Sequence, residues 1–194
     1  MPPKRVVVVA AGLTERSALP GLTRHLVEEG VAVVDVRIPP ARGALTPESA
    51  TRIMKAAWYE LEGRGQRPAK FVLLVDAGGR SPDDVLAPYR ERCDQLTEIP
   101  ASRLVVFAQW HLEAWFFADA ESLRQHLGRD LGHVDTSRPD EIQRPKLHLR
   151  HLLGGFYTAN IAGRIAAQLD ARTIAGRSRS FAAFEDALRN GAPA

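Results

Sequence analysis

The class of fold follows from residues 71–79, which read Phe-Val-Leu-Leu-Val-Asp-Ala-Gly-Gly. Five consecutive apolar residues are typical of a strand that is buried on both faces, as in a parallel sheet. Short apolar runs of the same kind occur at Val6–Ala10, Val31–Arg37 and Arg103–Ala108, with Phe71–Asp76 as the third of the four. We therefore predict four strands of one mostly parallel sheet.

Helical patterns separate these runs. The segments Thr46–Glu48 and Ser81–Asp83 each combine a capping residue, a proline suited to the first helical position and an acidic first turn. The stretch Ser17–Glu29 has apolar residues at helical spacing, and Gly30 ends it. Strands that alternate with helices in this way predict an α/β fold in which helices flank the sheet.

The pattern changes after Ala108. We predict an α/β core over residues 1–110, followed by a mostly helical C-terminal region over residues 111–194 that packs on the core, so that the chain forms one compact domain. The helices expected in the second part are Leu112–Leu127, Leu147–Leu153, Asn160–Leu169 and Ser180–Leu188.

The composition is that of an ordinary globular protein, with 194 residues, 45% hydrophobic and 25% charged, and a net charge of +3. Cys93 is the single cysteine, which excludes a disulfide or a cysteine-based zinc site within one chain. No apolar run approaches the roughly 20 residues of a membrane span, and Val6–Ala11 is too short for a signal peptide. We expect a cytoplasmic protein with no membrane partner. The sequence also contains no phosphate-binding loop, nucleophile elbow or dinucleotide glycine motif.

Two carboxylates follow predicted strands at the same edge of the sheet. Glu15 lies in the turn after the first strand, and Asp76 ends the third strand beside two glycines. Sites in open parallel sheets form beyond the carboxyl ends of the strands, and carboxylate oxygens suit Mg²⁺ or Mn²⁺. Such an ion could polarise a phosphodiester and activate water. The alternative is structural: Glu15 would complement a helix dipole, and Asp76 would form a turn.

Residues 109–119 read Gln-Trp-His-Leu-Glu-Ala-Trp-Phe-Phe-Ala-Asp and directly follow the fourth strand. On one helix, Glu113 and Asp119 would lie about 600° of rotation apart, so they cannot easily be ligands of one ion. Glu113 is nearer the strand end and is the candidate site residue, whereas Asp119 is predicted to cap or pair structurally. We expect the aromatic residues to belong to the core rather than to a platform that stacks bases.

The excess of positive charge lies in the C-terminal third. Residues 121–194 carry 11 Lys and Arg against 8 Asp and Glu. Lys146 follows a proline at a predicted helix start and is a candidate for contacting a phosphate, so nucleic acid is a predicted partner. His148 and His151 could share a face of this helix, but no third zinc ligand lies nearby. A solvated basic surface is the alternative.

These motifs resemble those of a Toprim-like family, known as domain of unknown function 4276. The resemblance covers most of the chain, and its most distinctive part is His111–Asp119, with the fairly specific string Glu-Ala-Trp-Phe-Phe-Ala-Asp. The other matching segments are Gly12–Glu15, Leu73–Asp76, Pro139-Asp140, Pro145-Lys146, Ser180-Phe181 and Asn190-Gly191.

The resemblance implies a Toprim-like fold, a divalent-metal-dependent nuclease activity and a place in anti-phage defence beside an ATPase partner. On this interpretation Glu15 and Asp76 are ligands of Mg²⁺ or Mn²⁺, Glu113 is an accessory carboxylate and Lys146 contacts the phosphate.

The chain departs from the Toprim pattern at two expected carboxylates, where it has Ala11 and Gly78. The loss of two negative charges should weaken the binding of Mg²⁺. The alternative function is therefore a catalytically degenerate subunit that docks on an ATPase or on nucleic acid. The sequence leaves open whether the chain forms a homo-oligomer.

Overall fold

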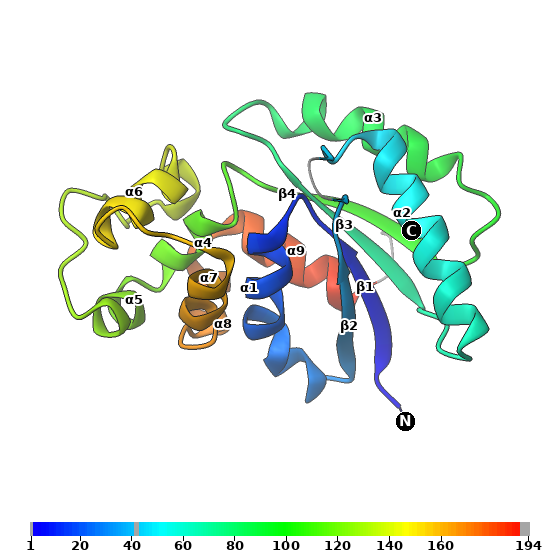
Figure 1. The fold of residues 1–194 in the computed structure, drawn as a ribbon, viewed down its shortest axis with the longest axis horizontal. Coiled ribbons are helices and arrows are strands. Elements are labelled where there is room, and N and C mark those ends of the chain that lie inside the picture. Colours follow the sequence, from blue (N-terminus) through cyan, green and yellow to red (C-terminus); the bar gives the residue numbers. More distant parts are fainter. Residues whose placement is uncertain (1, 41–42, 191–194) are drawn as a thin grey trace.

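The computed structural model describes residues 2–40 and 43–190, and a four-stranded sheet forms its centre (Figure 1). The strand order is β2-β1-β3-β4, and every neighbouring pair is parallel. The predicted Toprim-like α/β architecture, with flanking helices and a helical C-terminal region, is confirmed. The strands are β1 Lys4–Val9, β2 Val31–Arg37, β3 Lys70–Asp76 and β4 Ser102–Ala108.

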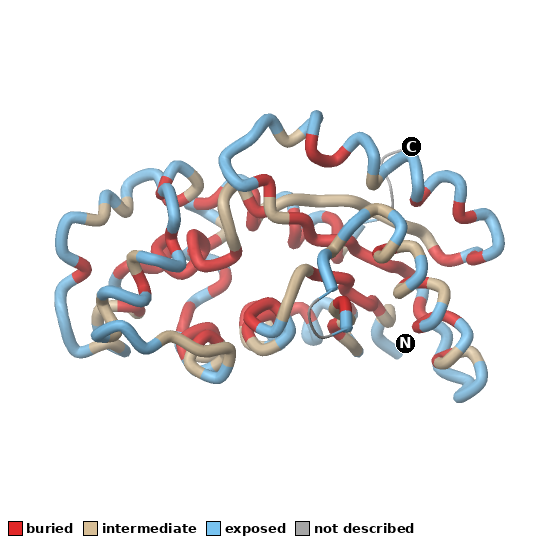
Figure 2. The backbone as a smooth tube through the Cα atoms, turned by 45° about the horizontal axis from the view of Figure 1, so that its top comes forward, coloured by how far each residue is buried: buried red, intermediate tan, exposed pale blue. Residues whose placement is uncertain are grey.

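The two central strands, β1 and β3, are the most deeply buried, whereas β2 and β4 are partly exposed edge strands (Figure 2). Alternate residues of Val6–Val9 enter two different hydrophobic clusters, because successive side chains of a strand point to opposite faces. One cluster contains α1 (Leu13–Thr23) and α9 (Arg179–Arg189), and the other contains α2 (Pro47–Gly63) and α3 (Pro82–Asp94). Both faces of the sheet are therefore covered by helices.

The helix starts follow the predictions in part. Thr46 caps α2 in a complete capping box, in which its side chain accepts from the Ser49 amide at 3.1 Å and its own amide donates to the Ser49 hydroxyl at 2.8 Å. Ser81 precedes α3, but its side chain makes no capping hydrogen bond. Proline at the first position and two acidic residues support this helix start instead.

The helix predicted over Ser17–Glu29 starts and ends earlier. It begins at Leu13 as α1, directly after Gly12, and gives way after Thr23 to a short 3₁₀ helix, η1 Arg24–Val27. The earlier start places Glu15 within the first helical turn instead of in the loop before it. Gly30 ends the segment with φ at 79°, as its position in the sequence predicted.

The C-terminal region is helical as predicted, with two corrections. The helix expected over Leu112–Leu127 is two helices, separated at Asp119, whose backbone leaves the helical region and whose carboxylate caps the second. The helix α8 was not predicted. The elements are α4 Glu113–Ala118, α5 Ala120–Leu127, η2 Pro139–Glu141, α6 Pro145–Leu152, α7 Ala159–Ala166, α8 Ala171–Arg177 and α9.

An aromatic cluster joins this region to the sheet. Trp115 is fully buried, its ring lies 5.1 Å from that of Phe181 and 5.4 Å from that of Phe184, and its indole N–H donates to the Ser180 hydroxyl at 2.7 Å. Because Phe181 and Phe184 belong to α9, which packs against β4, the two parts of the chain share one core. Across the described part of the chain, no helix has the length and apolar character needed to cross a membrane.

Candidate functional site

The predicted site residues meet at the C-terminal edge of the sheet. The chain leaves β1 and enters α1, whose first turn holds Glu15, and Asp76 is the last residue of the neighbouring strand β3. Glu15 is buried and Asp76 is partly buried. The negative charge of Glu15 adds to burial in raising the pKa of Asp76, so the two carboxylates are close enough to interact electrostatically.

Asp76 is the most strongly perturbed carboxyl group of this cluster. Burial is the main cause that raises its pKa to about 8, the charges of Glu15 and Glu113 raise it further, and Lys146 opposes them. Three carboxylates and one ammonium group therefore lie close enough for their charges to act on one another. Such an excess of negative charge favours the uptake of a proton or of a cation.

Glu113 provides a second unusual feature. It begins α4 and is only 1% exposed, and burial raises its pKa against the opposing effects of its own backbone amide and Lys146. The Lys146 ammonium lies 3.9 Å from its Oε1 atom. This oxygen has no hydrogen-bond partner among the described residues. The charge of this buried carboxylate is therefore balanced by the Lys146 ammonium and not by a hydrogen bond to this oxygen.

Two further residues of the cluster were not predicted from the sequence. Burial and the charge of Lys146 lower the pKa of His111, and Glu15 opposes them; burial and the charge of Glu113 raise the pKa of Tyr157. In the part of the chain that the structure describes, neither the His111 Nδ1 atom nor the Tyr157 hydroxyl has a hydrogen-bond partner. His111 belongs to the distinctive segment 109–119, whereas nothing in the sequence around Tyr157 points to the site.

A cavity of about 400 Å³ lies beside Asp76. Its lining bears on one of the two positions, Ala11 and Gly78, at which the chain lacks a carboxylate of the Toprim pattern. Ala11 lines this cavity together with Asp76, Arg80 and Asp84. The position at which the family resemblance predicts a glutamate therefore shares a cavity with Asp76, but it carries only a methyl group. Gly78, at the other expected carboxylate, has φ at 60°, and no atom lies within 4 Å of the point that a side-chain carbon would occupy there.

The residues present suit a weak divalent-cation site and not a complete one. Among residues 2–40 and 43–190, no group of three or more His, Cys, Asp or Glu side chains is arranged to hold a metal ion. Mg²⁺, however, is commonly held by only one or two carboxylates together with several waters. Glu15 and Asp76 provide two such carboxylates. Burial is the main cause that raises the pKa of Asp76, and a cation would relieve the further contribution from the charges of Glu15 and Glu113.

The other predicted residues have structural roles or lie elsewhere. Asp119 accepts hydrogen bonds from the backbone amides of Ser122 at 3.3 Å and Asp170 at 2.8 Å, so its structural role is confirmed. Trp115 and the two residues that follow it are fully buried core residues, also as predicted. His148 lines a separate cavity of about 250 Å³ with His133, and no third zinc ligand completes a site among the described residues.

Comparisons with known proteins give similarity at the level of structure. No protein-family model matches the chain, so membership of domain of unknown function 4276 is not confirmed, and no curated protein matches either. The C-terminal region of the Burkholderia pseudomallei OLD protein is 18% identical, with 95% of this chain and 98% of that chain covered and a TM-score of 0.44. The C-terminal region of the Xanthomonas campestris pv. campestris OLD protein is also 18% identical, with 96% of each chain covered and a TM-score of 0.42. At these values we take no functional argument from the similarity.

Proposed function

We propose that the chain is a divalent-metal-dependent nuclease that hydrolyses phosphodiester bonds at the C-terminal edge of its sheet. The observation that carries this proposal is the cluster of Glu15, Asp76 and Glu113, whose charges act on one another in a partly desolvated space beside Lys146. Phosphodiester hydrolysis needs a cation to stabilise charge on the phosphate and a group to position the attacking water. The cluster offers residues for both tasks.

Each side chain has a distinct role in this proposal. Glu15 and Asp76 would hold Mg²⁺ or Mn²⁺, which when bound supplies a Lewis acid for the phosphate and an activated water. Lys146 is 57% exposed at its side chain and remains near Glu113, so its ammonium can reach a phosphate oxygen while the carboxylate restrains it. Glu113 acts as an accessory carboxylate, which restrains the Lys146 ammonium through their ion pair.

The first test is binding of the metal alone. At pH 7 Asp76 is largely protonated because its pKa is about 8, so a cation that binds there must release a proton. Calorimetric titration with MgCl₂ or MnCl₂ in buffers of different ionisation enthalpy measures that release directly. We expect proton release with the natural chain, and none with Asp76→Asn. The exposed carboxylate of Asp83, at the start of α3, provides the matched control in Asp83→Asn.

The second test is cleavage. Plasmid and single-stranded DNA incubated with Mn²⁺ or Mg²⁺ should be cut by the natural chain, and Glu15→Gln or Asp76→Asn should remove the activity, whereas Asp83→Asn should retain it. Lys146→Ala should slow cleavage about tenfold or more, because one charged contact to the phosphate is lost. Metal binding and cleavage that survive in Asp76→Asn would contradict the proposal.

A catalytically degenerate binding subunit is the second candidate, and two observations favour it. Ala11 stands where a carboxylate would complete the acidic set, and no group of three metal-ligating side chains occurs in the described ranges. Retained affinity for DNA without metal binding or cleavage would support this function. A role in anti-phage defence, an ATPase partner and a cytoplasmic location remain predictions, and the oligomeric state remains open. Co-purification with the product of an adjacent ATPase gene would test the partner.

A further inference from the structure

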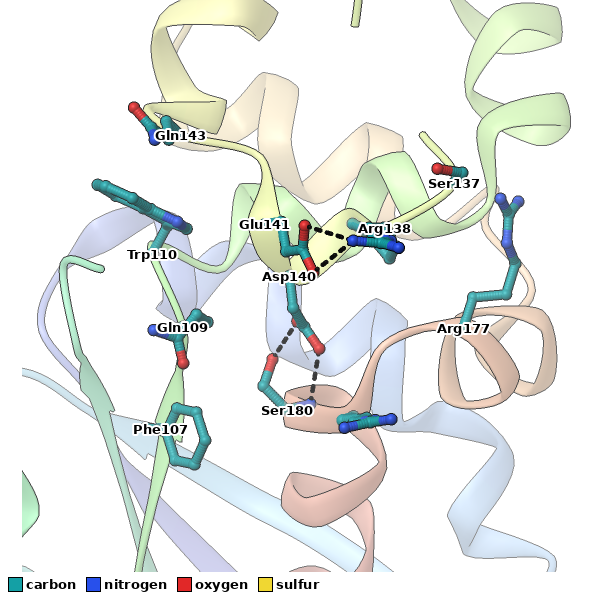
Figure 3. A pocket seen from close by; sticks show the side chains of 12 residues that line it. Phe107, Gln109, Trp110, Ser137, Arg138, Asp140, Glu141, Gln143, Arg177 and Ser180 are labelled. Atoms are coloured by element: carbon teal, nitrogen blue, oxygen red, sulfur yellow. Dashed lines mark hydrogen bonds and ion pairs between the residues drawn. The ribbon is translucent and has the colours of Figure 1, made fainter. Parts of the chain in front are cut away.

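A further cavity, of about 800 Å³, lies between the end of β4 and the start of α9 (Figure 3). We infer that this cavity binds an unpaired nucleotide of a single-stranded nucleic acid. The inference rests on the proposed function in one respect, because it names the class of substrate that the carboxylate site would cleave. Three features of the cavity wall support this inference. They are an aromatic ring at one side, guanidinium groups at the other, and a carboxylate that already accepts three hydrogen bonds.

The guanidinium groups give the cavity its charge. Arg138, Arg177 and Arg179 line it, against the carboxylates of Asp140 and Glu141. Glu141 is exposed and lies 3.4 Å from Arg138. Arg177 donates to two backbone carbonyls, at 3.0 Å and 2.7 Å, which fix the orientation of its guanidinium without neutralising its charge. A fixed guanidinium is pre-organised for a phosphate oxygen.

Asp140 does not make the cavity a cation site. Its Oδ1 atom accepts from the hydroxyls of Ser178 at 2.8 Å and Ser180 at 2.7 Å, and its Oδ2 atom accepts from the Ser180 amide at 3.1 Å, as Figure 3 shows for Ser180. The carboxylate thus anchors the start of α9, and its charge is spread over three donors. The ligand that suits the remaining wall is an anion.

Trp110 provides the aromatic side of the wall. A side-chain carbon at Gly79 would lie 2.4–2.9 Å from three atoms of the six-membered indole ring, so the backbone at Gly79 packs directly against that ring. The Gly79 amide also donates to the Gln109 carbonyl at 2.8 Å, which holds the two loops together. A ring supported in this way and only partly buried is a rigid surface on which a base can stack.

The chain connects this cavity to the carboxylate cluster. Trp110 is followed by His111, and Glu113 lies two residues further on, so the same short segment contributes to both sites. A single strand with one phosphate at the carboxylates could place a neighbouring base against Trp110. In a duplex the base faces are stacked on their neighbours, and they are not free to enter a cavity on the protein surface. The cavity therefore favours unpaired nucleotides.

The experiment measures binding without cleavage, in EDTA, with a short fluorescein-labelled oligothymidylate as the probe. Trp110→Ala should weaken binding about tenfold, in line with the loss of one base–aromatic stack, whereas Trp110→Phe should retain most of the affinity. Arg179→Gln should weaken binding and reduce the slope of log affinity against log salt by about one. The exposed Arg52 on α2 provides the control variant Arg52→Gln, which should leave both quantities unchanged.

Tryptophan fluorescence gives an independent reading of the same event. Trp58 and Trp115 are 5% and 0% exposed, whereas Trp110 is more exposed, so a base that stacks in the cavity should quench mainly Trp110. Oligothymidylate should quench the emission of the natural chain, and an oligomer of abasic sites should not. Thermal midpoints of all variants, measured alongside, establish that each of them is folded.

Several outcomes would overturn the inference. One is equal affinity of the natural chain and folded Trp110→Ala for the probe. The others are duplex DNA that binds as tightly as the single strand, and displacement of the probe by inorganic phosphate at concentrations comparable to its own. Because the assay contains no metal, a failure of the proposed metal site would leave these results unaffected. Conversely, cleavage activity with an unchanged Trp110→Ala affinity would reject the cavity and retain the nuclease.

Discussion

Replacing Asp76 by asparagine should stabilise the protein, and by an amount that grows with pH. The folded state raises the pKa of this carboxyl group to about 8, mainly through burial and then through Glu15 and Glu113. In the unfolded chain the group titrates near its ordinary value of about 4. Between these two values the folded state binds the proton more tightly, so the stability of the natural protein falls as pH rises toward 8.

The magnitude follows from the width of this window. Each pH unit inside it changes the free energy of unfolding by at most about 1.4 kcal/mol. From pH 5 to pH 8 the upper limit is therefore roughly 4 kcal/mol. Because Asp76 retains some contact with water and Lys146 is near, we expect about half of this upper limit. For a chain of this size, that difference in the free energy of unfolding corresponds to roughly 4–8 °C in thermal midpoint.

The assay is thermal or urea unfolding of the natural chain and Asp76→Asn at several pH values without divalent cations. The quantity of interest is the difference between the two proteins, because other titrating groups then cancel. This difference should increase from pH 5 to pH 8 and level off above it. Asp83→Asn, at an exposed carboxylate, should show a nearly constant difference. A flat curve for Asp76→Asn, or a large loss of stability, would refute the reasoning and make Asp76 a structural residue.

Three further predictions concern the two sites. Ala11→Glu should place a third carboxylate in the cavity beside Asp76 and tighten Mg²⁺ binding by tenfold or more in calorimetric titration; unchanged affinity would mean that this position does not face the ion. Gly79→Ala should lower the free energy of unfolding by about 1–3 kcal/mol in urea, because the new methyl group would meet the indole ring of Trp110. Gly78 has a similar positive φ but no neighbour within 4 Å, so Gly78→Ala should lower it by less. Lys146→Ala should make the salt dependence of DNA binding shallower by about one, and an unchanged slope would remove Lys146 from the interface.

The helices with local start signals were predicted well. The capping box at Thr46 and the glycine stop at Gly30 depend on neighbours within a few residues, so the sequence contains their whole explanation. The break at Asp119 was missed because its cause is not local. The Asp119 carboxylate also accepts from the amide of Asp170, 51 residues away, and the sequence pattern alone continues as one helix.

The same distinction applies to the candidate site. Glu15, Asp76 and Glu113 could be named because each follows a strand, and the ends of parallel strands meet at one edge of a sheet. Tyr157 could not be named, because it reaches the cluster from the loop between α6 and α7, which carries no periodic or motif signal.

The sequence by itself determined the strands, most of the helices and the carboxylates at the strand ends, since these depend on short-range patterns of burial and capping. Only the tertiary structure decided which distant groups come together. It pairs Glu113 with Lys146, places Ala11 and Asp76 at one cavity, and packs Gly79 against the Trp110 ring. Charge interactions and desolvation depend on distances between atoms that are far apart in the chain, and no local pattern of residues records those distances.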